Sequence, residues 1–98
     1  MYLVREVFNT KPGKAKELVK MFKAVAPHFA KSQEMKNIRI MSDVVGPYWT
    51  VVFESEVSDL GEFFGGLRSA TMSDEAKEIM KNYLDCVAGG RREIYVLE

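Results

Sequence analysis

Two charged side chains in the middle of the chain are best placed to do chemistry on a small molecule. Arg39 lies in a segment that alternates apolar and polar residues, and Glu54 lies in a second such segment that follows it. Neighbouring strands of a hairpin can bring such a pair onto one face of a sheet. Arg39 would then hold an anionic group of a ligand, and Glu54 would accept a proton from another part of the same ligand. The alternative is a salt bridge within or between subunits.

Tyr48 and Trp49 begin the second of these segments and complete the candidate ligand-binding set of Arg39, Glu54, Tyr48 and Trp49. The hydroxyl of Tyr48, or that of Tyr95 further along the chain, would hydrogen-bond a ligand. The alternative is a tyrosine that packs its ring and leaves its hydroxyl in water. No residue is assigned a catalytic role, because no motif in the sequence specifies a reaction.

The single histidine and the single cysteine predict neither a metal site nor a cofactor. His28 follows Pro27 in a helical pattern, where it would act as a general base or, in the simpler interpretation, interact with a helix end. Cys86 has no histidine near it in sequence and no helix N-terminus beside it, so we interpret it as a small packing residue. One residue of each type cannot complete a zinc-binding set, and the carboxylates lack the spacing of a calcium loop.

Composition limits the class of protein. The chain has 98 residues, of which 47% are apolar and 29% are charged, so we expect one globular domain over 1–98. Fourteen basic residues balance fourteen acidic ones, which argues against a chain built to hold a nucleic-acid backbone. No apolar run reaches the roughly 18 residues that a membrane span needs. The strand-like start predicts no signal peptide, and a lone cysteine fits a reducing cytoplasm.

The first half of the chain predicts a strand, a helix and a hairpin. Aromatic and β-branched residues over 1–10 are typical of a strand. Apolar residues then recur every three or four positions over 15–32, as in a helix with one buried face, and Pro27 predicts a kink or a restart. Two alternating strands follow over 37–44 and 48–57, joined by a turn at Gly46-Pro47.

The second half predicts two more helical segments and a last strand. Ser58 or Asp59 would cap a helix that Gly65-Gly66 weakens, so we expect a loop from there to residue 72. Ser73 would cap the next helix, and Gly89-Gly90 would end it. The alternation over 91–98 then predicts a strand.

This order of elements predicts the fold class. Strand, helix, strand, strand, helix and strand in one small domain most simply give a ferredoxin-like βαββαβ arrangement of the α+β class. The four strands would form an antiparallel sheet with the helices on one face.

The second face of that sheet has the composition of an interface. The alternation assigns one set of residues to the helix side: Ile38, Ile40, Trp49, Val51 and Phe53. It leaves a second set on the face without helices: Met41, Tyr48, Thr50 and Val52. A sheet face with this apolar content is unusual on a monomer, so we expect a homodimer to bury it. The same face carries charges that must pair, lie at a rim or line a wet cavity between two facing sheets: Arg39, Asp43, Glu54 and Glu56.

Two stretches of the chain resemble a known group of proteins. The first is the strand that ends before Lys11-Pro12-Gly13-Lys14, with an apolar helix behind it. The second is Tyr48-Trp49-Thr50-Val51-Val52-Phe53-Glu54-Ser55-Glu56-Val57, which passes to a helix through Ser58-Asp59-Leu60-Gly61-Glu62-Phe63. In these stretches and in its order of elements, the chain resembles the dimeric α+β barrel superfamily. The nearest resemblance is to NIPSNAP-like and antibiotic-biosynthesis-monooxygenase-like domains.

The resemblance implies a homodimer whose two sheets form a barrel, with ligands bound between sheet and helices or inside the barrel. It also implies a range of activities that includes cofactor-independent monooxygenases, small-molecule isomerases and domains without known activity. Haem-degrading members use an asparagine on the first strand, a tryptophan, and a histidine on the second helical region. Asn9 and Trp49 are present, but the only histidine, His28, lies in the first helix, so we exclude haem degradation.

We therefore expect a cytoplasmic homodimer that binds a small apolar or anionic organic molecule, with a cofactor-independent monooxygenase-like reaction as its enzymatic form. The alternative is a non-catalytic structural or regulatory dimerisation module, in which the sheet face is only an interface. A third hypothesis is an RNA-binding sheet, because Tyr48, Trp49 and Phe53 lie on a βαββαβ scaffold. The neutral net charge argues against it, so we expect neither a nucleic acid nor a membrane as partner.

Overall fold

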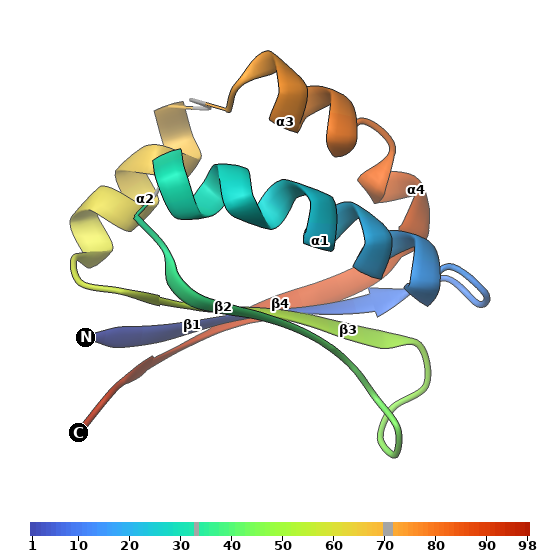
Figure 1. Ribbon diagram of the computed structural model, residues 1–98. Coiled ribbons are helices and arrows are strands. Elements are labelled where there is room, and N and C mark those ends of the chain that lie inside the picture. The colour runs from blue at the N-terminus through green and yellow to red at the C-terminus, as the bar shows by residue number, and fades with distance from the viewer. Residues whose placement is uncertain (33, 70–71) are drawn as a thin grey trace.

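One antiparallel sheet, covered on a single side by helices, makes up the fold of the computed structural model, which describes residues 1–32, 34–69 and 72–98 (Figure 1). The strands lie in the order β2-β3-β1-β4. This confirms the predicted ferredoxin-like βαββαβ arrangement of the α+β class. The elements are β1 (Tyr2–Thr10), α1 (Ala15–Ser32), β2 (Lys36–Ser42), β3 (Thr50–Val57), α2 (Leu60–Ser69), α3 (Asp74–Ile79), α4 (Tyr83–Cys86) and β4 (Val87–Val96).

The register of the central strand β1 decides which side chains share a face. Val4 lies opposite Ser55 of β3 and Ile94 of β4, and both pairings are antiparallel. Because side chains alternate along a strand, even-numbered residues of β1 face the helices and odd-numbered ones face away. We call the side without helices the open face. Its side chains include Leu3, Arg5 and Val7 of β1, Arg39 and Met41 of β2, Val52, Glu54 and Glu56 of β3, and Arg91, Glu93 and Tyr95 of β4.

The apolar stripe of α1 supplies much of the core. Leu18 and Phe22 are buried against Val51 and Phe53 of β3. The rings of Phe22 and Phe53 meet edge to face, with their centroids 5.4 Å apart. The helix has the predicted bounds and passes through Pro27 as a single element, so the predicted restart does not occur.

Helix α2 is longer than the sequence predicts. Asp59 caps it, since its Oδ1 accepts a hydrogen bond from the backbone N–H of Glu62 at 2.9 Å. The helix continues through Gly65-Gly66 to Ser69, where a loop was expected. Phe63 is buried in the core and anchors the helix, and this packing outweighs the cost of roughly 1 kcal/mol for each glycine. Residues 70 and 71 of the predicted loop lie outside the described residues.

The stretch from Ser73 to the last strand departs most from the prediction. Ser73 caps α3 as predicted, because its Oγ accepts a hydrogen bond from the N–H of Ala76 at 3.1 Å. Two short helices, α3 and α4, replace the single helix expected here, and β4 begins before the glycine pair. Gly89 and Gly90 therefore lie within a strand and do not end a helix. A Cβ at Gly90 would lie 2.4 Å from the carbonyl oxygen of Val7, so the close approach of β4 to β1 requires glycine there.

The predicted hairpin of β2 and β3 is confirmed, with a longer connection than expected. Tyr48 and Trp49 belong to the connecting loop, because β3 begins only at Thr50. Trp49 has φ of 61°, in the left-handed region that a strand cannot continue through.

Candidate functional site

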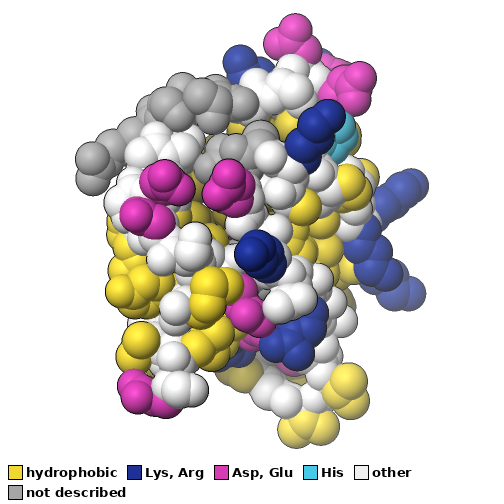
Figure 2. Space-filling model, turned by 60° about the vertical axis from the view of Figure 1, so that its left-hand side comes forward, with side chains coloured by type: hydrophobic (Ala, Val, Ile, Leu, Met, Phe, Trp, Pro, Cys, Tyr) yellow, Lys and Arg dark blue, Asp and Glu magenta, His cyan; other side chains and the backbone are white. Residues whose placement is uncertain are grey.

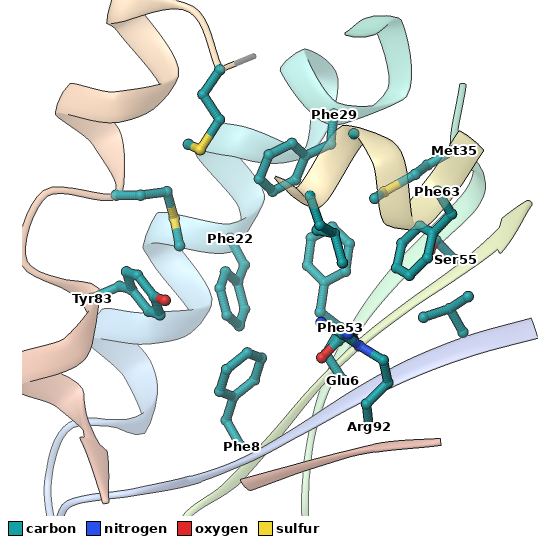
Figure 3. Close-up of a pocket in the computed structure, with 15 residues that line it drawn as sticks. Glu6, Phe8, Phe22, Phe29, Met35, Phe53, Ser55, Phe63, Tyr83 and Arg92 are labelled. Atoms are coloured by element: carbon teal, nitrogen blue, oxygen red, sulfur yellow. Dashed lines mark hydrogen bonds and ion pairs between the residues drawn. The ribbon is translucent and has the colours of Figure 1, made fainter. Parts of the chain in front are cut away.

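A cavity of about 300 Å³ lies between the helix-facing side of the sheet and the helices (Figure 3). Its walls come from β1, β3 and β4 of the sheet and from α1, α2 and α4 above it. A pocket of this volume lies at the lower end of the range that proteins use for small organic ligands. Most of its lining consists of aromatic and methionine side chains: Phe8, Phe22, Phe29, Phe53, Phe63, Tyr83, Met35, Met72 and Met80.

Four phenylalanines from three elements form a continuous aromatic wall. Phe8 of β1 contacts Phe22 of α1, with ring centroids 5.2 Å apart. Phe53 of β3 lies edge-on to Phe22 at 5.4 Å and to Phe29 at 5.9 Å. Edge-to-face rings of this kind hold one another in place. The cavity therefore offers a preformed apolar surface to a ring-containing ligand.

An ion pair between Glu6 and Arg92 gives this cavity a polar end. The two residues are direct partners in the register of β1 and β4, and the Nε of Arg92 donates to the Oε1 of Glu6. The guanidinium carbon of Arg92 lies 5.6 Å from the ring centroid of Phe63 and 5.9 Å from that of Phe64. The carboxylate and the ring faces together hold the guanidinium in one place. The Arg92 and Glu6 side chains remain 39% and 23% exposed, which leaves both accessible to a ligand.

Two hydroxyl groups add hydrogen-bonding capacity to the lining. Ser55 of β3 is only 2% exposed, and Tyr83 belongs to α4. With Glu6 and Arg92 they give the cavity an anionic acceptor, a cationic donor and two groups that can do either. This set could orient a ligand that carries one or two polar atoms on an apolar body.

The open face carries a row of alternating charge across all four strands. Arg39 of β2 donates to Glu54 of β3, as the spacing in the sequence predicts. The other carboxylate oxygen of Glu54 lies 3.4 Å from Nε of Arg5 in β1, and Arg5 Nη1 lies 3.0 Å from Glu93 of β4. Glu54 is only 6% exposed although no helix covers it. We call Arg39, Glu54, Arg5 and Glu93 the charge row.

Glu93 at the end of the charge row has a carboxyl pKa below its ordinary value. The main cause is the hydrogen bond from Arg91, whose Nε lies 2.6 Å from Oε2 of Glu93, and the hydroxyl of Tyr95 adds a second bond at 3.0 Å. Both stabilise the ionised carboxylate. The charge row is therefore bonded within one chain from end to end.

The four residues predicted to bind a ligand lie outside the cavity. Arg39 and Glu54 are brought together on the open face, while Tyr48 and Trp49 lie in the loop after β2 and are 88% and 45% exposed. The pocket predicted for them, between two facing sheets, requires a second copy of the chain and stays a prediction.

Sequence reasoning missed the polar pair of the cavity. Glu6 interrupts an apolar strand between Val4 and Phe8, and the alternation of that strand assigns it to the same face as those two residues. A charged residue at a helix-facing position was the signal that could have indicated it. The partner, Arg92, could not be found in the same way, because its pairing with Glu6 depends on β4 lying beside β1 in the sheet.

Other candidate residues have ordinary structural surroundings. Cys86 is 1% exposed, and burial, followed by the nearby Glu17 carboxylate, raises the pKa of its thiol. The Nε2 of His28 lies 4.0 Å from the carboxylate of Glu75. Across residues 1–32, 34–69 and 72–98, no cluster of three or more potential ligands could hold a metal ion. No helix in this described part is long and apolar enough to span a membrane.

Comparison with known proteins connects this architecture to a group of solved structures. No protein-family model matches the sequence, and no curated protein matches it significantly. A NIPSNAP domain protein from Burkholderia xenovorans superposes with a TM-score of 0.80 at 11% identity, over 100% of this chain and 95% of that one. A NIPSNAP family protein from Agrobacterium tumefaciens gives 0.78 at 13% identity, over 98% and 92%. A candidate antibiotic biosynthesis monooxygenase from Chloroflexus aurantiacus gives 0.69 at 11% identity, over 99% and 92%.

The chain therefore has the fold that NIPSNAP and antibiotic-biosynthesis-monooxygenase-like proteins share. This confirms the predicted resemblance at the level of the fold. Identities this low carry no residue roles from those proteins to this one, because fold alone does not specify a site.

Proposed function

We propose that this protein binds a small, mainly apolar organic molecule in the cavity between its sheet and its helices. The observation that carries the proposal is the aromatic cavity with the Glu6–Arg92 ion pair projecting into it. Burial in such a cavity gains roughly 25 cal/mol for each Å² of apolar ligand surface removed from water. The ion pair then decides which polar groups a ligand can carry.

The chemistry of the polar end favours a ligand that both donates and accepts hydrogen bonds, or that carries an anionic group toward Arg92. Glu6 can only accept hydrogen bonds when ionised, and Arg92 can only donate them. A hydroxyl beside a carbonyl on a ring would satisfy both at once. An unsubstituted hydrocarbon would leave their remaining capacity unused and would bind less tightly.

We also propose that the protein acts as a homodimer through the open face, in a reducing cytoplasm. The mixture of apolar side chains and paired charges on the open face supports an interface between copies. The buried free thiol of Cys86 is in keeping with a reducing compartment.

An enzymatic form of this function would be a cofactor-independent, monooxygenase-like reaction on the bound molecule. The name of the Chloroflexus neighbour supports this direction, and the cavity has the apolar lining that such a reaction needs. Glu6 is then the residue placed to take a proton from an acidic hydroxyl of the substrate. The alternative function is a non-catalytic dimerisation module, which the bonded charge row of the open face favours.

The proposal is tested by titrating the protein with 1-anilinonaphthalene-8-sulfonate, an aromatic anion whose fluorescence rises in apolar surroundings. Native protein should bind one probe per chain in a saturable way. Arg92→Gln should weaken binding about tenfold, because it removes the donor and leaves Glu6 to repel the sulfonate. Arg91→Gln is the matched control, because the side chain of Arg91 lies on the open face of the same strand. This substitution should leave the affinity for the probe unchanged.

Equal weakening in the Arg91 and Arg92 variants would contradict the site, because it would place the probe outside the cavity. No saturable binding by a folded native dimer, to this probe or to a set of small hydroxylated aromatics, would favour the dimerisation module. Uptake of dioxygen in the presence of a bound aromatic would separate an enzyme from a binding protein.

A further inference from the structure

The loop between β2 and β3 exposes apolar side chains to an unusual degree. Val44, Val45 and Tyr48, which we call the hairpin tip, are 97%, 95% and 88% exposed. A loop that faces only water has no reason to place two β-branched residues and a tyrosine together, and clustered exposed apolar residues usually mark a binding surface.

The base of the hairpin tip is fixed by hydrogen bonds that do not involve the exposed side chains. The N–H and Oγ1 of Thr10 both donate to the carbonyl oxygen of Trp49, at 2.7 and 2.9 Å. The N–H of Thr50 donates to Oδ1 of Asp43 at 3.0 Å, and its Oγ1 donates to the carbonyl oxygen of Pro47 at 2.7 Å. The base of the loop is therefore held in place before the hairpin tip meets a partner, which lowers the entropy lost on binding.

The hairpin tip and the C-terminal segment lie at opposite ends of the sheet, and both bend toward the side away from the helices (Figure 1). Exposed hydrophobic side chains lie along the lower edge of Figure 2, which is this same side. At the C-terminal end Tyr95 and Leu97 are 50% and 42% exposed. Apolar projections therefore border the open face at both ends.

The charges between these projections favour a second copy of the chain as partner. The charge row holds two arginines and two glutamates in alternation, so the open face is close to neutral. A strongly acidic or basic partner would repel half of the row. An interface between identical copies must be self-complementary, and an alternating row meets that condition.

We propose that the hairpin tip is an intersubunit contact, which packs against the open-face side of a second copy and clamps the two sheets together. The proposal deepens the proposed homodimer by assigning the residues that hold it, and it rests on that part of the function. In the assembled dimer the aliphatic side chains of Val44 and Val45 leave water.

The test uses the single tryptophan of the chain, Trp49, which lies at the base of the hairpin tip. Native protein is diluted from high to low concentration while light scattering gives its mass and Trp49 fluorescence reports burial of the tip. The double variant Val44→Ser with Val45→Ser is compared with Leu84→Ser. Leu84 is a matched control because it is 66% exposed on α4, on the helix side of the molecule.

Native protein should dissociate on dilution with a red shift of the tryptophan emission. The double variant should raise the dissociation constant at least about tenfold, while the control leaves it unchanged. A native dimer that the double variant leaves intact would overturn the role of the hairpin tip and leave the homodimer standing. A native protein that is monomeric at every concentration would overturn both. The serine variants keep the hydrogen bonds of the tip base, and thermal unfolding of the diluted proteins checks that they fold.

Discussion

The two faces of the sheet solve the problem of charge on an apolar surface in different ways. On the helix side, Glu6 and Arg92 form one pair at the edge of an aromatic cavity. On the open face, Glu54 pairs with arginines on both neighbouring strands, Arg5 and Arg39. A carboxylate between two guanidinium groups has its acceptor capacity satisfied by its own chain, whereas a single pair beside an apolar cavity keeps capacity for a ligand. The difference suggests recognition of a small molecule on one side and assembly on the other.

The largest difference in unfolding free energy is expected between substitutions at two consecutive glycines of β4, Gly89 and Gly90, which lie on opposite faces of the sheet. Gly90→Ala should cost about 3 kcal/mol of unfolding free energy, because the new Cβ would meet the carbonyl oxygen of Val7 and force the strands apart. Gly89→Ala meets nothing within 4 Å and should change stability by less than about 0.5 kcal/mol. Urea unfolding of both variants measures the difference. Equal stabilities would show that β4 does not approach β1 as described.

Two neighbouring valines of β3 allow the two faces to be compared by the stability that each buried side chain contributes. Val51 is fully buried on the helix side, whereas Val52 lies half-buried on the open face. Val51→Ala should cost about 2 kcal/mol, from the lost methyl groups and the cavity they leave. Val52→Ala should cost less than about 1 kcal/mol in dilute monomer. If the two costs are the same under those conditions, the assignment of the faces is wrong.

The charge row should make stability depend on acid pH. The pKa of Glu93 is lowered from its ordinary value of 4.5, first by the bond from Arg91. Its contribution to stability is therefore fully present above that ordinary value and is lost as the pH falls through the lowered pKa. Glu93→Gln should show a smaller loss of stability over this acidic window in urea unfolding at several pH values. Glu78→Gln, at an exposed position of α3, should follow the native curve, and a Glu93 variant that does so too would rule out the contribution.

The last and smallest effect concerns the thiol of Cys86, whose reaction rate tells a buried cysteine from a reactive one. Burial raises the pKa of its thiol above the ordinary 9.0, and the Glu17 carboxylate adds to the shift. The folded protein should therefore react slowly with a disulfide reagent at neutral pH, at a rate that follows transient unfolding. Reaction on mixing, as fast as in denaturant, would contradict the buried position.

Much of the fold was predictable from the sequence, because it follows from local periodicity. The strand over 1–10, the helix over 15–32 and the hairpin all have clear patterns of spacing, and their order limits the topology. The glycines misled the prediction in both helical segments of the second half. Gly65-Gly66 lies in a helix that Phe63 anchors, and Gly90 is required by contact with another strand. Neither tertiary contact has a signal in the local sequence.

The site was predictable only in part, for a related reason. The sequence correctly pairs Arg39 with Glu54, because adjacent strands of a hairpin have a register set nearby. Glu6 and Arg92 are 86 residues apart in the chain and meet only because β1 and β4 pair. A ligand site built from such distant strands becomes visible only when the sheet order is known.

A ligand should bind on the helix side of the sheet and not on the open face. Methionine methyl groups lie on both sides of the sheet and can report where the ligand binds. Met35, Met72 and Met80 line the cavity, whereas Met41 lies on the open face. With 13C-labelled methionine methyl groups, a titration with 1-anilinonaphthalene-8-sulfonate should shift the signals of the three cavity methionines and leave Met41 unchanged. A shift of the Met41 signal, with the signals of the cavity methionines unchanged, would contradict binding in the cavity. It would place the ligand on the open face, between two facing sheets.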